Sequence, residues 1–141
     1  MIEKVDVYLN FNGNAAAAAQ LYGEAFGKQV EITKFKDFPT FNEMKGVNPE
    51  AIGHAEIAFD NLVLMFSDSP GLPIIPGNNF SLSWATDDEA SFHKTWNTFV
   101  ETDSTVHEEP VQTFYATLYG RLEDPFGISW LFLYHKPGSE R

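Results

Sequence analysis

Hydrophobic and polar positions alternate over residues 5–11, and this period of two predicts a β-strand. The pattern then breaks, and five consecutive alanines follow. Alanine is the strongest helix former, and apolar residues at helical spacing continue the pattern. We therefore expect a helix over 15–26, with Asn14 as its N-cap and Gly27 as its C-cap.

The rest of the first half combines strand patterns with one long irregular segment. Strands are expected over 30–35 and in a hairpin formed by 52–59 and 62–67. Segment 36–50 holds prolines and a glycine but also several apolar side chains. Two interpretations stay open for it, a flap that covers a binding site or an irregular segment that docks on the core.

The same order of patterns begins again after a connector. Residues 69–79 hold three prolines and two glycines, and a strand pattern follows over 80–85. Thr86, followed three residues later by Glu89, has the spacing of a capping box at the start of a second amphipathic helix. Residues 105–113 are expected to form a loop followed by a strand.

A last hairpin is expected from 114–122 and 128–134, so both halves have the order strand, helix, strand, strand, strand. We interpret the chain as one domain, 1–141, made of two βαβββ modules, 1–69 and 80–136. This order predicts an α+β fold with two curved mixed sheets whose helices lie on the outer faces. The inner faces would form a cup.

Composition narrows the classes of function. The chain has no cysteine, which removes disulfides, thiolate zinc sites and cysteine nucleophiles. Its formal charge is −11, and Lys94 is the only basic residue from Gly46 to Gly120, so we expect neither nucleic acid nor a membrane surface as a partner. The sequence shows no signal-peptide pattern and no apolar run long enough to span a bilayer, so we expect a cytoplasmic protein.

Aromatic residues make up 15% of the chain, with 13 Phe, 5 Tyr and 3 Trp. Most of these rings are expected in the core. A small-molecule pocket is also typically lined by aromatic rings with a few polar groups, so some rings are expected at such a site.

Several segments carry a family likeness. They are VYLNFNGNA (7–15), GHAEI (53–57), LMFSD (64–68), GNN (77–79), QTFYA (112–116), YG (119–120) and DPFGISW (124–130). From about residue 3 to 135 the chain resembles the vicinal-oxygen-chelate superfamily, which includes glyoxalase I and the bleomycin and fosfomycin resistance proteins. The closer resemblance is to its PhnB-like branch, whose domains are labelled 3-demethylubiquinone 3-methyltransferase. This resemblance implies the cup-shaped fold and a homodimer.

One departure from the branch is the run Phe114-Tyr115-Ala116, where the branch usually has Phe-Trp-Gly. The aromatic ring is kept, but the indole donor and the glycine are lost. If this run lines the pocket, ligand preference differs from that of its relatives.

Metal-dependent members of the superfamily hold an ion with His, Gln or Glu from four inner strands. The resemblance places at these positions Asp6, one of 64–66, Ser81 or Ser83, and Leu131. Aliphatic and hydroxyl side chains at three of the four positions do not hold a divalent ion. The resemblance therefore implies no metal and no cofactor. We also find no glycine-rich turn for a nucleotide-bearing cofactor, which weighs against the methyltransferase label.

His54 and Glu56 are two residues apart on a predicted strand, so both point to one side of the sheet. Three interpretations stay open: a histidine hydrogen-bonded within the sheet, contact with a ligand as an acid–base pair, or metal ligands completed by Asp68 or His135.

We expect a protein that binds a small apolar or aromatic molecule in the cup without a metal. The residues expected to line the pocket are Tyr8, Asn10, His54, Glu56, Ser83, Phe114, Tyr115 and Trp130. No residue is assigned a catalytic role. The alternative is a metal-dependent lyase, isomerase or dioxygenase with a relocated site at His54, Glu56 and Asp68.

Overall fold

The chain forms two β-α-β-β-β units in a computed structural model that describes residues 1–138. The first unit is Met1–Ile74, and the second begins at Ile75, inside the connector over 69–79. The predicted order of elements is confirmed in both halves, and the fold class is α+β.

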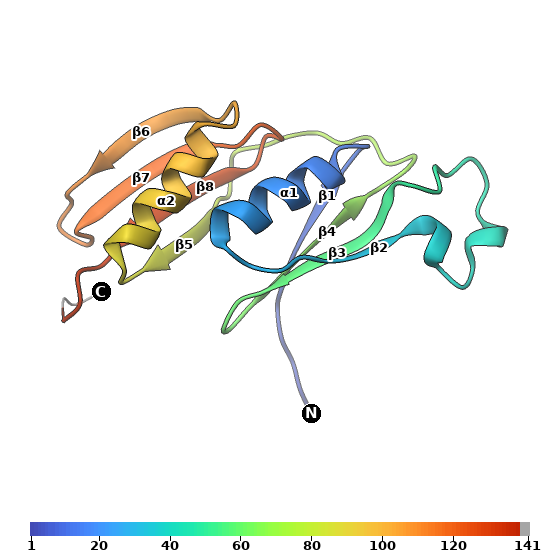
Figure 1. Cartoon of the computed structure of the whole chain (residues 1–141), viewed down its shortest axis with the longest axis horizontal. Coiled ribbons are helices and arrows are strands. Elements are labelled where there is room, and N and C mark those ends of the chain that lie inside the picture. Colours follow the sequence, from blue (N-terminus) through green and yellow to red (C-terminus); the bar gives the residue numbers. More distant parts are fainter. Residues whose placement is uncertain (139–141) are drawn as a thin grey trace. The chain divides into compact units, whose positions relative to one another are not determined.

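The first unit holds one helix and one mixed sheet (Figure 1). Its elements are β1 (Val7–Phe11), α1 (Ala15–Phe26), β2 (Glu31–Lys34), β3 (Ile52–Ala58) and β4 (Val63–Asp68). The strands lie in the order β1-β4-β3-β2, with β1 parallel to β4 and the other neighbours antiparallel. Two short 3₁₀ helices, Phe35–Asp37 and Phe41–Glu43, lie between β2 and β3.

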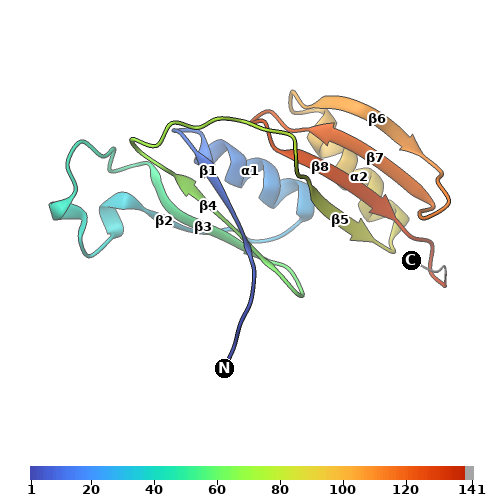
Figure 2. The same ribbon diagram turned by 180° about the vertical axis from the view of Figure 1, so that it is seen from behind.

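The second unit repeats this arrangement, and Figure 2 shows its strands from the side opposite to that of Figure 1. Its elements are β5 (Leu82–Thr86), α2 (Glu89–Val100), β6 (Thr105–Val111), β7 (Leu118–Glu123) and β8 (Ser129–Tyr134). The strand order is β5-β8-β7-β6, with β5 parallel to β8. Neither helix within residues 1–138 has the length and apolar character needed to cross a bilayer.

Every second residue in the middle of the first sheet packs against α1. Leu9 pairs with Phe66, which pairs with Ala55, and all three are buried. The ring of Tyr22 on α1 meets that of Phe66 edge-on, with 5.7 Å between centroids. Because side chains alternate along a strand, the intervening residues point away from α1.

The core of the second unit is built largely from aromatic rings. Phe132 on β8 contacts Trp96 and Phe99 of α2, at centroid distances of 5.5 and 5.2 Å. Trp130 also contacts Phe99, at 5.5 Å. Much of the high aromatic content is therefore used in packing α2 on its sheet.

Helix α1 covers the predicted residues, but its start is held differently from the prediction. Asn14 makes no side-chain cap bond. Instead Asp68, at the end of β4, accepts the backbone N–H of Ala15 at 3.1 Å. At the other end Gly27 has φ 62°, the left-handed conformation that glycine adopts at low cost, which confirms the predicted C-cap.

Helix α2 does not use the predicted capping box. Its N-cap is Asp88, whose carboxylate accepts the backbone N–H of Ser91 at 3.0 Å. Thr86 belongs to β5, and its hydroxyl accepts the N–H of Asp88 at 3.1 Å. Hydrogen bonds from the hydroxyl and the N–H of Ser91 hold the pKa of Asp88 below its usual value.

The strand limits in the second unit also differ from the prediction. β6 begins at Thr105, where a loop was expected, and β7 begins only at Leu118. Phe114 and Tyr115 therefore lie in the loop between these two strands. Loop side chains are not constrained by strand alternation, so the period of two says nothing about where these two rings point.

Candidate functional site

Four residues predicted for the ligand site share the face of the first sheet that points away from α1. Tyr8 pairs with Met65, which pairs with Glu56, and Asn10 pairs with Ser67. His54 lies two residues before Glu56 on β3 and points to the same side. We call this surface the polar face. Its members are Tyr8, Asn10, His54, Glu56, Met65 and Ser67.

Side-chain contacts connect four members of the polar face. His54 Nε2 lies 3.1 Å from Glu56 Oε1, and the Tyr8 hydroxyl donates to Ser67 Oγ at 2.9 Å. The rings of Tyr8 and His54 are 6.0 Å apart between centroids. Tyr8 is 44% exposed, and the side chains of His54 and Glu56 are 34% and 41% exposed. An aromatic ring, an imidazole and a carboxylate are thus available together on one surface.

Asp68 does not join His54 and Glu56. By strand alternation it lies on the α1 side of β4. Its carboxylate accepts three backbone N–H groups, those of Gly13 at 2.7 Å, Ala15 at 3.1 Å and Ile52 at 3.0 Å. Residues 1–138 contain no group of three or more His, Cys, Asp or Glu that could hold a metal ion. The prediction of a relocated metal site at His54, Glu56 and Asp68 is therefore wrong.

The positions at which the resemblance places metal ligands do not provide a ligand set either. Ser83 pairs in register with Leu131 on the second sheet. Asp6, the one carboxylate among these positions, accepts the N–H of Val63 at 3.1 Å and pairs with Lys4 at 2.9 Å. The bond from Val63, followed by that from Lys4, lowers the pKa of Asp6. One carboxylate that is already bonded to Val63 and Lys4, with a hydroxyl and an aliphatic side chain, does not make a ligand set for a divalent ion.

Two residues predicted for the pocket lie on opposite sides of the second sheet. Ser83 is exposed and, like Leu131, faces away from α2. Trp130 is 3% exposed, and its Nε1–H donates to Asp124 at 3.0 Å. The Trp130 ring is therefore part of the core beneath α2, which differs from the ligand-facing position expected from the sequence.

The other two predicted residues of this unit form an exposed aromatic corner. Phe114 is 100% exposed, and its ring contacts that of Tyr115 at 5.0 Å. Tyr115 in turn lies 6.0 Å from the ring of Tyr119, which is buried. Burial, followed by the charge of Glu108, raises the pKa of Tyr119. This corner therefore offers exposed aromatic surface from two neighbouring rings.

A separate cavity of about 410 Å³ lies in the second unit where β5 and β8 end. It is lined by Ala85, Thr86, Asp87, His135, Lys136, Pro137 and Gly138. Nδ1 of His135 is buried and has no hydrogen-bond partner within residues 1–138. None of the eight residues predicted for the ligand site lines this cavity.

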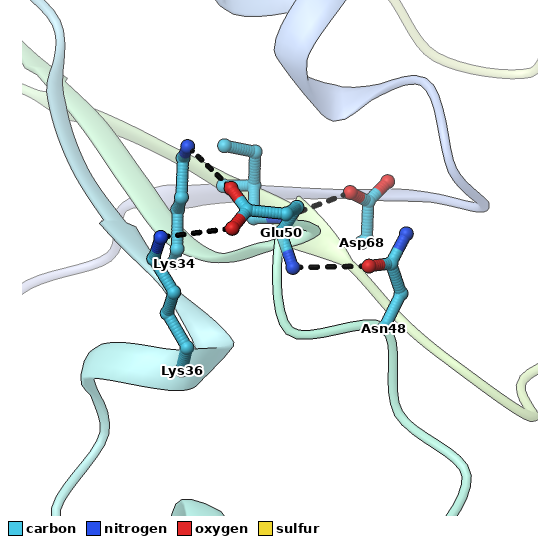
Figure 3. A network of polar contacts seen from close by, with 6 residues as sticks. Lys34, Lys36, Asn48, Glu50 and Asp68 are labelled. Atoms are coloured by element: carbon cyan, nitrogen blue, oxygen red, sulfur yellow. Dashed lines mark hydrogen bonds and ion pairs between the residues drawn. The ribbon is translucent and has the colours of Figure 1, made fainter.

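The segment between β2 and β3 is tied to the first sheet at its base (Figure 3). Glu50 accepts hydrogen bonds from Lys34 Nζ at 2.7 Å and Lys36 Nζ at 2.8 Å. Farther along, the ring of Phe38 lies against Gly53 of β3, where a Cβ would come within 2.5 Å of Phe38 Cζ. These contacts support the interpretation that the segment docks on its own unit, at least at these two points.

The two lysines also lower the pKa of Glu50 from 4.5 to about 2, with Lys34 the larger cause. Because the pKa is lower in the folded state, the pairing stabilises the fold above pH 4.5, and this contribution is lost as the pH falls toward 2. Glu50 is 56% exposed, so solvent and salt screen the pairing.

We expect Lys34→Gln to raise the pKa of Glu50 more than Lys36→Gln does, as measured by NMR titration of the carboxyl carbon. Lys45→Gln, in the same segment, is the control, and an equal rise with it would contradict the prediction.

The chain is similar to known proteins in sequence and in fold. A family model described as 3-demethylubiquinone-9 3-methyltransferase matches residues 3–133. Protein PA1353 from Pseudomonas aeruginosa is 27% identical over 96% of this chain and 99% of that chain, with a TM-score of 0.83. A putative 3-demethylubiquinone-9 3-methyltransferase, PhnB protein, from Bacillus cereus is 19% identical over 94% and 99%, with a TM-score of 0.70.

A glyoxalase/bleomycin resistance protein/dioxygenase family enzyme from Burkholderia phytofirmans is 15% identical over 91% of this chain and 97% of its own, with a TM-score of 0.62. At this identity the similarity concerns the fold alone. No curated protein matches the chain. The chain therefore has the glyoxalase and bleomycin resistance fold predicted from its sequence.

A methyltransferase description implies a nucleotide-bearing methyl donor, and such cofactors are commonly held at a glycine-rich strand-to-helix turn. In the turn between β1 and α1, the N–H groups of Gly13 and Ala15 donate to Asp68. At the start of α2, the N–H of Ser91 donates to the N-cap Asp88. Carboxylates of the chain itself occupy these backbone donors, so the two turns do not fit that cofactor.

Asp68 is the residue whose role the sequence analysis missed. It was weighed as a metal ligand, whereas its carboxylate joins β4 to the start of α1 and to β3. The signal in the sequence was an acidic residue directly after the predicted strand 62–67. This residue can be assigned to the turn before α1 only once β4 is known to pair with β1.

Proposed function

Because the chain belongs to the 3-demethylubiquinone-9 3-methyltransferase (PhnB-like) family, we propose that it binds a small neutral or cationic molecule with an aromatic ring on the polar face, without a metal. The observation that carries the proposal is the half-exposed ring of Tyr8 beside the imidazole of His54 and the carboxylate of Glu56. An aromatic ring supplies apolar contact area, and a few polar groups fix the orientation of the ligand.

Charge on the first sheet supports a ligand that is not anionic. Glu31 on β2 pairs in register with Glu56, so two carboxylates lie side by side. Among the residues of β1–β4, Lys34 carries a positive charge, and its ammonium group bonds to Glu50 rather than to these two carboxylates. An anionic ligand would be repelled by these two like charges, whereas a neutral or cationic ligand would not.

Residues of the second unit enter this proposal only as predictions. Ser83, Phe114 and Tyr115 stay predicted ligand contacts. The homodimer expected from the family resemblance also stays a prediction.

Phenol, benzylamine and benzoate test the proposal, since they share an aromatic ring and differ in charge. Their binding is followed through the backbone amide signals in NMR titrations. We expect saturable shifts centred on β1 and β3 with phenol and benzylamine. Benzoate is expected to bind at least about tenfold more weakly, which corresponds to about 1.4 kcal/mol.

Two variants locate the binding surface. Tyr8→Leu removes the ring on the polar face and is expected to raise the dissociation constant about tenfold. Phe80→Leu removes an exposed ring of the second unit outside the predicted site and serves as the matched control. The proposal fails if none of the three probes binds, or if Tyr8→Leu and Phe80→Leu change the affinity equally.

A further inference from the structure

His54 and Glu56 form a hydrogen-bonded pair on an inner strand of the sheet. β3 lies between β2 and β4, with His54 opposite Thr33 and Glu56 opposite Met65. Glu56 is thus paired on both sides, with Glu31 on β2 and Met65 on β4, and His54 is paired with Thr33 on β2. The distance of 3.1 Å between Nε2 and Oε1 is therefore built on a rigid element rather than on a loop.

The hydrogen bond determines which nitrogen of His54 is basic. An ionised carboxylate only accepts hydrogen bonds, so Nε2 of a neutral imidazole facing Glu56 carries the hydrogen. Nδ1 then carries the lone pair. Within residues 1–138 no hydrogen-bond partner contacts Nδ1, and the side chain is only partly buried. This arrangement leaves a basic nitrogen available to a bound molecule.

Charged and titratable groups around His54 come from three strands. They are Tyr8 on β1, Glu31 on β2 and Glu56 on β3, while β4 contributes the uncharged Met65 and Ser67. The imidazolium that forms when His54 accepts a proton would carry its charge beside the Glu56 carboxylate, whose Oε1 lies 3.1 Å from Nε2.

We propose that His54 is a general base, which removes a proton from a weakly acidic C–H of the small neutral or cationic aromatic molecule bound on the polar face. This inference rests on the proposed function. The proton moves to Nδ1, and the electron pair of the broken C–H bond stays on the substrate, delocalised into its unsaturated system. The imidazolium then returns the proton, so the step needs no oxidant, reductant or second reactant. Glu56 is a positioning residue. Its carboxylate keeps the hydrogen of neutral His54 on Nε2 and stays beside the imidazolium once this has formed.

The probe for this activity is 5-nitrobenzisoxazole, a neutral aromatic molecule with one acidic ring C–H. When a base takes this proton, the C–H electron pair forms the third bond of a nitrile. The N–O bond breaks, and its electron pair stays on oxygen as a coloured phenolate. The reaction reports proton removal without another catalytic group, and its rate is followed by absorbance.

We expect the wild-type chain to convert the probe faster than imidazole at the same concentration. His54→Gln is expected to lower kcat/KM at least about tenfold, within the range for general bases. The matched control is His93→Gln, because His93 also pairs with a glutamate, at 3.5 Å from Glu89, but on α2. Thermal unfolding of the variants confirms that each is folded.

Glu56→Gln distinguishes a positioning role from a merely structural one through the separate values of kcat and KM. The amide of glutamine can donate as well as accept a hydrogen bond, so it no longer keeps the hydrogen of neutral His54 on Nε2. We expect kcat to fall at least about threefold while KM stays within about twofold of the wild-type value. An unchanged kcat in Glu56→Gln would overturn the role given to this residue.

Binding of the same probe, measured by NMR, separates this inference from the proposed function. In one outcome the probe binds on the polar face while wild type and His54→Gln convert it at equal rates. That result overturns the role of His54 as a general base and leaves the proposed function standing. Absence of binding on the polar face overturns both.

Discussion

Asp68→Ala is expected to lower the free energy of unfolding by about 3 kcal/mol. The carboxylate is buried and accepts backbone N–H groups of Gly13, Ala15 and Ile52. Alanine removes the acceptor for all three donors at once. A buried donor without a partner costs roughly 1–3 kcal/mol, and water that enters the vacated space recovers part of the sum. Urea unfolding at neutral pH measures the loss.

A second variant and a control make this test specific. Asp68→Asn keeps one carbonyl oxygen but turns an amide group toward at least one N–H donor, so its loss should lie between wild type and alanine. Asp88→Ala removes the exposed N-cap of α2 and is expected to cost only about 1 kcal/mol. If Asp68→Ala costs no more than Asp88→Ala, the carboxylate of Asp68 does not hold the strands and the helix together.

The two ends of α1 show which features a local pattern predicts. The limits of the helix were predictable, because helix-forming alanines and a glycine that adopts positive φ act within a few residues. The group that binds its first N–H comes from Asp68, 53 residues away, and becomes a neighbour only through the pairing of β4 with β1. Asn14 satisfied the local rule for an N-cap, but the tertiary contact took its place.

Strand β8 shows why the position of Trp130 was not predictable. Five of its six residues are large and apolar or aromatic, so the period of two that separates two faces is absent. The contacts of Trp130 and Phe132 with Phe99 on α2 identify the face that packs in the core. A sequence without alternation leaves both faces equally suited to core or pocket.

The polar face was partly predictable. His54 and Glu56 share a side because two residues on one strand always do, and their hydrogen bond follows from that spacing. The approach of Tyr8 to His54 depends on the strand order β1-β4-β3, in which two distant strands are brought together by β4. The βαβββ repeat predicted the order of elements along the chain but not this order of strands in the sheet.

Gly120→Ala is expected to lower the free energy of unfolding by about 2 kcal/mol, within the range for overpacked cores. Gly120 lies on β7 beneath α2, and a Cβ there would come within 2.7 Å of Trp96 Cζ3 and 3.0 Å of Cη2. Trp96 is buried and also packs edge-on against Phe132, so its ring has little room to shift. The glycine is therefore required by the close approach of the indole ring to the strand.

A double-mutant cycle identifies the indole as the cause. Trp96→Leu is itself destabilising, but it vacates volume above the strand, so Gly120→Ala should cost at least about 1 kcal/mol less in that background than in the wild type. Gly77→Ala is the matched control, because a Cβ there would meet nothing closer than Asn79 Oδ1 at 3.8 Å, and its effect should stay within about 0.5 kcal/mol. Additive costs in the cycle would mean that the strand, rather than the ring of Trp96, excludes the extra methyl group.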